Sequence, residues 1–332
     1  MRAAGGTSGK LAARRCYSPI SVAIYLAFRA TGLAAQEVEL KISGDITFLA
    51  GFGDLEDDQT GSDHEVFETD GSFTVEAFFQ TRDPDLRWGA ITEFTADTNS
   101  DPDPEKAFLF LRSPYGDPRF GLDDTTATSI NYSAPFVAVG TGGLDGDILD
   151  SPELVFLTAT DTDNSRIIYY SPFFENWQLG LSYSSNDETK ENDDDNFDEL
   201  IEGTLNYYQE KDDFEIGAAL SVADAQSYKG AMLSGVVGLD EFAIAGGIAA
   251  EEVGDVQRQF YNLGIALEIE PFDTSLNWGQ CVHCDDGDSW NLIGGIEVGL
   301  LPGTSTAIEV SRSRSDEGAY GTIALFSLEF EF

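Results

Sequence analysis

Positively charged side chains are scarce in this chain of 332 residues. Eighteen Lys and Arg stand against 60 Asp and Glu, which gives a formal net charge of −42. Binding to the phosphates of a nucleic acid requires a basic face, and this composition does not supply one. Nucleic acid is therefore excluded as a partner.

Long hydrophobic runs are also missing. No window reaches the 18 or more consecutive apolar residues of a membrane-spanning helix, which excludes an α-helical inner-membrane protein. Methionine occurs only twice, whereas glycine occurs 34 times. This balance favours a protein of strands and turns over a helix bundle.

Residues that commonly carry catalysis are few. The only histidines are His64 and His283, and the sequence has no Gly-x-Ser-x-Gly elbow, zinc-binding His pair or phosphate-binding glycine loop. We therefore expect no enzymatic activity and no cofactor. Acidic runs at 56–58, 191–195 and 285–286 leave two interpretations open, a Ca²⁺-bridged loop rim or simple hydration of exposed loops.

Cysteine is equally rare, with three residues. Cys281 and Cys284 are separated by two residues and flanked by Asn, Gly and Asp, which indicates a loop. We expect a disulfide between them, as in exported proteins, with a metal site or a redox motif as the alternatives.

The first 35 residues differ from the rest, because they hold five basic residues and no acidic one. A basic start, an apolar run at 19–28 and the small residues before Gln36 are typical of a secretory signal peptide cleaved near Ala35. The mature chain is then 36–332. A short amphipathic N-terminal helix is the alternative.

A period of two dominates the mature chain. Apolar residues alternate with polar ones from Val38 to Phe52 and again from Tyr320 to Phe332, and similar segments lie between. Short connectors alternate with longer polar ones, as in hairpins of an up-and-down sheet. About sixteen segments reach the roughly 10 residues that cross a membrane as a tilted strand. We predict an all-β, transmembrane antiparallel β-barrel; a secreted soluble β-sandwich is the alternative.

One connector, at 124–165, is much longer than the others. A structureless loop of this length is normally functional. It contains a glycine-rich stretch with acidic residues in and directly after it, and several apolar residues that suit packing against a wall. We expect it to fold into the barrel interior, with its carboxylates facing water: Asp145, Asp147, Asp150 and Glu153.

Three segments and the last residue carry a family resemblance. They are EVELKISGD at 37–45, YGDPRFG at 115–121, RIIYYSP at 166–172 and the terminal Phe332. In their order and spacing the sequence resembles the general diffusion porins of the Gram-negative outer membrane, in particular the short alphaproteobacterial ones. Many of these relatives have a second basic residue where Leu122 stands.

The resemblance implies a sixteen-stranded homotrimeric barrel whose third loop, here 124–165, narrows a water-filled pore for small hydrophilic solutes. Outer-membrane lipid and lipopolysaccharide are then the surroundings, and a sugar-specific channel is the alternative function. The acidic loop and the net charge favour cations. The alternation along the strands predicts that seven wall residues point inward and face the loop acids in the constriction: Lys41, Asp45, Glu76, Arg87, Glu93, Arg119 and Arg166.

Overall fold

The computed structural model describes residues 38–56, 62–80, 85–96, 103–140, 165–185, 199–211, 214–254, 256–284, 287–315 and 320–332. The predicted signal peptide at 1–35 lies outside these residues. Within them, no helix has both the length and the apolar character needed to cross a membrane.

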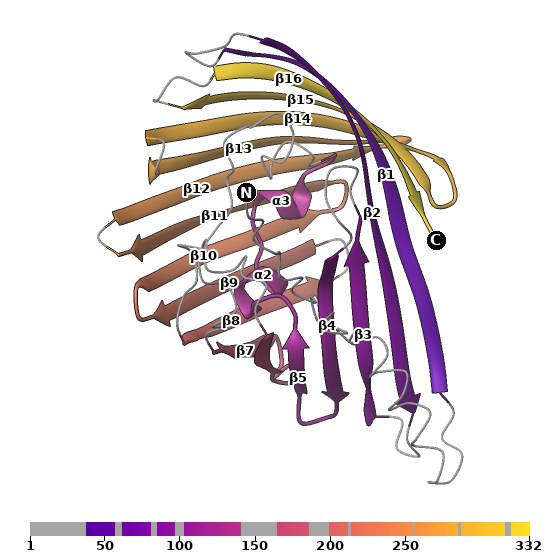
Figure 1. Cartoon of the computed structure of the whole chain (residues 1–332), viewed down its shortest axis with the longest axis vertical. Coiled ribbons are helices and arrows are strands. Elements are labelled where there is room, and N and C mark those ends of the chain that lie inside the picture. Colours follow the sequence, from indigo (N-terminus) through magenta and orange to yellow (C-terminus); the bar gives the residue numbers. More distant parts are fainter. Residues whose placement is uncertain are drawn as a thin grey trace, which may run out of the picture. The chain divides into compact units, whose positions relative to one another are not determined.

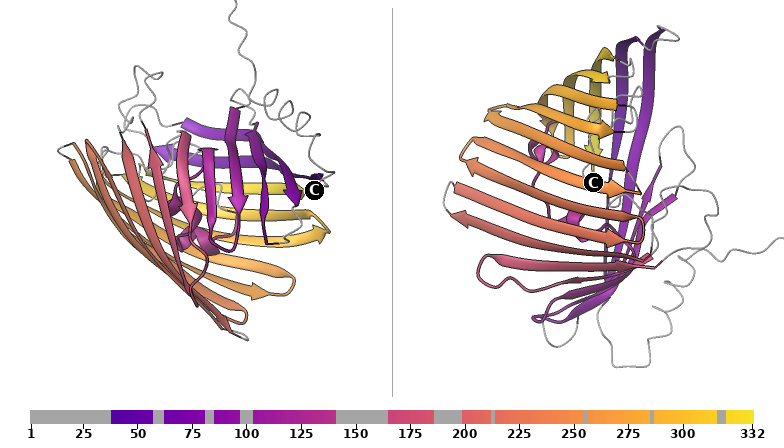
Figure 2. Two further views of the ribbon diagram at one scale, coloured as in Figure 1. Left: turned by 90° about the horizontal axis from the view of Figure 1, so that it is seen from below. Right: turned by 90° about the vertical axis from the view of Figure 1, so that its left-hand side faces the viewer.

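The described chain forms a closed antiparallel barrel of sixteen strands, in which each strand pairs with its neighbours in the sequence (Figures 1 and 2). The predicted fold class is therefore confirmed. The strands are β1 (Val38–Glu56), β2 (Ser62–Gln80), β3 (Arg87–Thr95), β4 (Asp103–Arg112), β5 (Asp117–Leu122), β6 (Ser165–Tyr170), β7 (Trp177–Ser184), β8 (Leu200–Lys211), β9 (Phe214–Ala225), β10 (Tyr228–Leu239), β11 (Phe242–Val253), β12 (Val256–Ile269), β13 (Phe272–Cys284), β14 (Gly287–Leu301), β15 (Thr304–Ser315) and β16 (Tyr320–Glu331).

The first and last strands close the barrel. Ile46 of β1 lies opposite Phe330 of β16, and the pairing runs on to Glu56 opposite Tyr320. Beyond the end of β16, Gly44 and Phe332 exchange backbone hydrogen bonds of 3.1 and 3.0 Å. The terminal phenylalanine thus belongs to the seam, and no strand of the barrel is left with an open edge.

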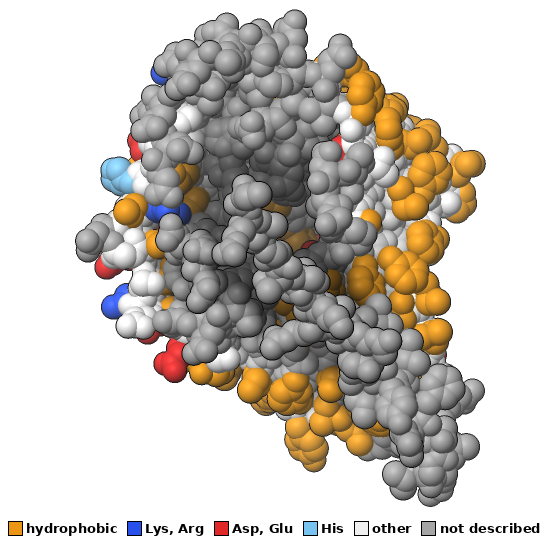
Figure 3. All heavy atoms as spheres, viewed as in Figure 1, with side chains coloured by type: hydrophobic (Ala, Val, Ile, Leu, Met, Phe, Trp, Pro, Cys, Tyr) orange, Lys and Arg blue, Asp and Glu red, His pale blue; other side chains and the backbone are white. Residues whose placement is uncertain are grey.

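Side chains alternate between the two faces of the sheet, and the apolar ones point outward. In β9, Leu220 and Val222 are about half exposed on the outer face, whereas Ser221 and Ala223 are buried inside. Hydrophobic side chains also gather on the outer surface over β1 and β2, at the right of Figure 3. This arrangement is the inverse of a soluble β-sandwich and suits a barrel surrounded by hydrocarbon.

The connectors differ at the two ends of the barrel. At one end the turns are short throughout, as at 240–241 and 302–303. At the other end, the alternation of the sequence also predicts longer polar connectors at 254–257 and 281–288, and this prediction is wrong: only 254–255 and 285–286 lie between the strands. Cys281 and Cys284 therefore lie in β13 and not in a loop. Polar sequence beyond the apolar belt is still able to pair as strand, so composition alone does not mark the strand ends.

The connector between β5 and β6 begins inside the barrel (Figure 1). Its described part contains two single-turn helices, α2 (Thr126–Ser129) and α3 (Ala134–Val137), which contact the inner faces of β7–β9 and β11–β13 respectively. The expectation of a structureless loop is thus wrong for this part. We call residues 125–140 the inner segment.

The outward orientation of the apolar side chains leads to a stability prediction. Leu263 of β12 is about half exposed on the outer face, so we expect Leu263→Arg to destabilise the barrel in lipid vesicles by about 2–4 kcal/mol. Ser327→Arg is the matched control. Ser327 is the eighth residue of β16, as Leu263 is of β12, but its side chain points to the inner face. Urea unfolding in vesicles measures both. Equal destabilisation by the two changes would contradict the assignment of faces.

Candidate functional site

The inner segment is held by side chains from several strands of the wall. The backbone N–H of Tyr132 donates to the Ser234 hydroxyl at 3.0 Å, and that of Ala134 donates to the side-chain carbonyl of Asn262 at 3.0 Å. The backbone N–H of Val139 donates to the Ser275 hydroxyl at 2.8 Å. These acceptors lie on β10, β12 and β13. Each of these three backbone N–H groups therefore has an acceptor on a different strand of the wall.

Glu202 of β8 holds the start of the same segment. Its carboxylate accepts the Thr126 hydroxyl at 2.6 Å and the backbone N–H of Ala127. Glu202 is 1% exposed and interacts electrostatically with Arg166, which is 4% exposed. Thr125 caps the first turn, since its hydroxyl accepts from the N–H of Thr128. A charged pair under the segment thus fixes where α2 begins.

Small residues on the wall let the inner segment approach the sheet closely. A Cβ added at Gly264 would lie 3.0 Å from Val137 and 3.1 Å from Ala134, and one added at Gly217 would lie 2.8 Å from the Tyr132 ring. A Cβ at Gly295 would clash with the backbone carbonyl of Val139. The absence of side chains at these positions therefore sets the position of the segment across the lumen.

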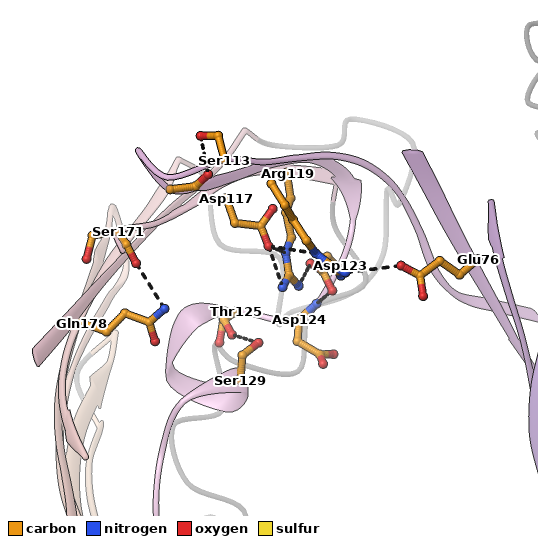
Figure 4. Close-up of polar contacts among 12 residues, drawn as sticks. Glu76, Ser113, Asp117, Arg119, Asp123, Asp124, Thr125, Ser129, Ser171 and Gln178 are labelled. Carbon is orange, nitrogen blue, oxygen red and sulfur yellow. Dashed lines mark hydrogen bonds and ion pairs between the residues drawn. The ribbon is translucent and has the colours of Figure 1, made fainter. Parts of the chain in front are cut away.

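Five carboxylates and three cations form an ionic cluster on the inner face near the inner segment, and Figure 4 shows the part of it around Arg119. The ion pairs within it are Lys106 with Glu93 (3.5 Å) and Asp124 (3.1 Å), Arg112 with Glu76 (3.3 Å) and Asp117 (3.6 Å), and Arg119 with Asp117 (3.3 Å) and Asp123 (2.9 Å). The ionic cluster has a formal charge of −2 when all its members are ionised. It is therefore an anionic part of the lumen wall despite its three cations.

Aromatic rings support the arginines of the wall. The guanidinium carbon of Arg112 lies 4.4 Å from the centroid of the Phe110 ring, and that of Arg119 lies 5.1 Å from Phe108 and 4.8 Å from Tyr170. Stacking of this kind restricts the long side chains and covers the rings. The inward aromatic rings of β4 are thus covered by charge and do not present an open apolar track to a solute.

A cleft of about 300 Å³ lies between the ionic cluster and α2. Arg112, Asp117 and Arg119 line one part of it, and Ser129, Tyr170 and Gln178 are among the residues that line the rest.

Burial raises the pKa of Asp123 above its usual value, although the Arg119 guanidinium opposes this. Asp123 consequently takes up a proton at a higher pH than an exposed aspartate does.

The structure places all seven predicted wall residues on the inner face. Lys41 lies opposite Glu76 in the β1–β2 pairing, and Asp45 accepts the Ser72 hydroxyl. Glu76, Glu93 and Arg119 join the ionic cluster, whereas Arg87 begins β3 at the short-turn end and lies over the Phe78 ring at 5.7 Å. The four predicted loop acids, Asp145, Asp147, Asp150 and Glu153, lie outside the described residues.

The sequence reasoning missed several members of the ionic cluster. Lys106 and Arg112 share the inner face of β4 with Phe108 and Phe110, and this alternation is visible in the sequence. Leu122 pairs with Ala107 and shares the outer face with Phe120, so the inward cations of this region come from β4. Asp117 shares the inner face of β5 with Arg119 and was visible from the same alternation. Asp123 and Asp124 carried no such signal, because they follow β5 and only the folded connector brings them to Arg119 and Lys106.

Cys281 and Cys284 form a disulfide in the structure, with 6.0 Å between their Cα atoms. Cys281 is fully buried and packs in a cluster with Ala127 of α2 and with Met232, Ala249 and Phe260 of the wall. The disulfide therefore lies beside the inner segment. His283 between the two cysteines is exposed, and its backbone N–H donates to Asp288 at 2.8 Å.

Comparison with known proteins identifies the family. Residues 21–318 match the family model described as Gram-negative porin. The chain belongs to this family. Porins are channels of the outer membrane, so family and fold together indicate a channel in that membrane and not an enzyme. No match was found among the curated proteins.

Solved structures show the same fold at low sequence identity. An anion-selective porin from Comamonas acidovorans is 15% identical with a TM-score of 0.69, and the alignment covers 89% of this chain and 100% of that one. A triple mutant of the Rhodopseudomonas blastica porin is 15% identical with a TM-score of 0.63 and the same coverage. The trimer form of OmpT from Vibrio cholerae is 12% identical with a TM-score of 0.64, covering 89% and 99%.

The close approach at Gly295 leads to a prediction for this porin. We expect Gly295→Ala to push Val139 off the wall, which lowers the single-channel conductance and destabilises the barrel by about 1–3 kcal/mol through overpacking. Gly294→Ala is the control, since its Cβ would face outward with its nearest neighbour at 3.8 Å. Planar-bilayer recording and urea unfolding measure the two effects. Unchanged conductance in a folded Gly295→Ala variant would show that the inner segment does not limit the pore.

Proposed function

We propose that this porin allows passive diffusion of small hydrophilic solutes and ions, with a preference for cations. The observation that carries the proposal is the ionic cluster, in which Lys106, Arg112 and Arg119 each have two carboxylates within 4.0 Å. Their positive potential is cancelled locally, and a surplus of negative charge remains. A passing cation meets a favourable field there, and a passing anion does not.

Residues 124–165 supply the second part of the proposal. The inner segment lies near the start of this connector and is bound to the inner wall of the barrel. This position supports placing the acidic residues that follow it in the lumen. We assign Asp145, Asp147, Asp150 and Glu153 to the constriction. There the four acids would add four negative charges to the lumen, and would face the ionic cluster and four other wall residues: Lys41, Asp45, Arg87 and Arg166.

The fold itself does not determine ion selectivity. The Comamonas acidovorans porin is called anion-selective, yet its barrel aligns with this chain over 89% of the residues. Selectivity therefore depends on which side chains line the lumen. Here, Arg258, another inward cation, also has a carboxylate nearby, with Glu251 at 3.6 Å.

The proposed cation preference is tested by neutralising the loop acids. We expect the combined change of Asp145, Asp147 and Asp150 to Asn and Glu153 to Gln to abolish or reverse the preference. The measurement is the reversal potential in a salt gradient near 1 M, where the Debye length is about 3 Å and charges at the loop rim are screened.

A matched variant separates the constriction from the rim. The combined change of Glu191 to Gln and of Asp193, Asp194 and Asp195 to Asn removes the same number of charges from the acidic run at 191–195. We expect this control to keep the cation preference at high salt. If both variants kept it, the loop at 124–165 would not control selectivity.

We further propose that the protein assembles as a homotrimer among outer-membrane lipids and lipopolysaccharide, as the family resemblance implies and as the trimer form of OmpT supports. Half-exposed apolar side chains cover the outer faces of the strands, so lipid and neighbouring protomers are the surfaces that suit them. Native mass spectrometry of the detergent-solubilised protein should give three times the mature mass. A monomer under conditions that keep the barrel folded would contradict this assembly.

A further inference from the structure

Two arginines on the outer surface of β15 interrupt its apolar face. Ile308 and Val310 are about half exposed on this face, and Arg312 and Arg314 follow them in the same alternation. The serines between and beside the arginines are buried inside the barrel. Both guanidinium groups therefore point away from the lumen.

The position along the strand is the outer end. β15 starts after the short turn at 302–303 and ends at Ser315, so both arginines lie in its last four residues. At about 3.3 Å per residue, they lie within about 10 Å of the strand end opposite the short turns. A charged side chain is tolerated on the lipid face only near such an interface.

Among the described residues, no carboxylate lies directly opposite either arginine in the strand register. In the register, Arg312 lies between Leu292 and Thr322, and Arg314 lies between Trp290 and Tyr320. Asp288, the next outward residue of β14, accepts the backbone N–H of His283. Within the described part of the chain, neither guanidinium has an ion pair.

Lys229 shows how another outward cation is accommodated. It lies at the same end of the barrel, is exposed, and is paired in the register with Asp224 on one side and Glu252 on the other. Its charge is thus offset by the protein itself. In the described part of the chain, Arg312 and Arg314 have no acidic residue directly opposite them, although acidic residues outnumber basic ones more than threefold in the chain.

We propose that Arg312 and Arg314 bind a phosphate group of an anionic lipid in the outer leaflet. A guanidinium presents a planar pair of N–H donors that matches phosphate oxygens, and two such groups two residues apart on one strand face are able to share one headgroup. Trp290 beside Arg314 suits the boundary between acyl chains and headgroups. Since acidic residues far outnumber basic ones in the chain, this pair gives an anionic lipid a defined place on it.

The test uses the folded full-length protein with bisphosphorylated lipid A as the probe, and native mass spectrometry to count retained lipid. We expect Arg312→Gln with Arg314→Gln to weaken retention about tenfold or more, and Lys229→Gln to leave it unchanged. Arg312→Lys with Arg314→Lys should retain an intermediate amount, because charge remains without the bidentate geometry. Heat-modifiable migration in gels verifies that every variant is folded.

Further arms distinguish the possible partners. Dephosphorylated lipid A should be retained no better by the native protein than by the double Gln variant. Equal retention of both lipids, or equal retention by both proteins, would overturn the proposal. Displacement of the lipid by millimolar inorganic phosphate alone would show a free-anion site instead, and dissociation of the oligomer without loss of lipid would show a protomer contact. The proposal rests on the outer-membrane location and not on cation preference, so its failure would leave the conductance results unaffected.

Discussion

Closure of the sheet is the constraint on which the rest of this structure depends. In hydrocarbon no water is available to hydrogen-bond an exposed backbone, so every N–H and C=O group must find a partner within the protein. The pairing of β1 with β16, completed by Phe332 beyond the last strand, removes the edges that would violate this rule. Once the sheet is closed, its two faces meet different surroundings, and this difference produces the outward apolar belt and the polar, charged interior.

Inside the barrel, the same rule applies to the inner segment. This segment has no strand partner, and side chains of the wall take that place, with Glu202, Ser234, Asn262 and Ser275 as acceptors. Glycines on the facing strands leave room for it. The segment lies against β7–β13 and the ionic cluster lies around β2–β5, so the lumen wall has an anchored part and an ionic part.

Much of this was predictable, because the alternation of apolar and polar residues is a direct consequence of two unlike surroundings. Parity alone placed Lys41, Glu76 and Arg166 on the inner face. Strand ends were less predictable, because strand pairing continues beyond the lipid, where nothing enforces the alternation. Cys281, for example, lies in β13 where the sequence predicts a loop. The anchoring residues had no local signal at all: an inward serine that accepts from Val139 looks the same in the sequence as any other inward serine. Such contacts depend on the path of a connector distant in sequence.

The anchoring of the inner segment also has a consequence for assembly. Its acceptors lie on β8, β10, β12 and β13, which follow the segment in the chain by 75 to 136 residues. The segment is therefore unable to take its final path until the middle and late strands have come into register. The contacts of the segment therefore report on the correct pairing of the wall.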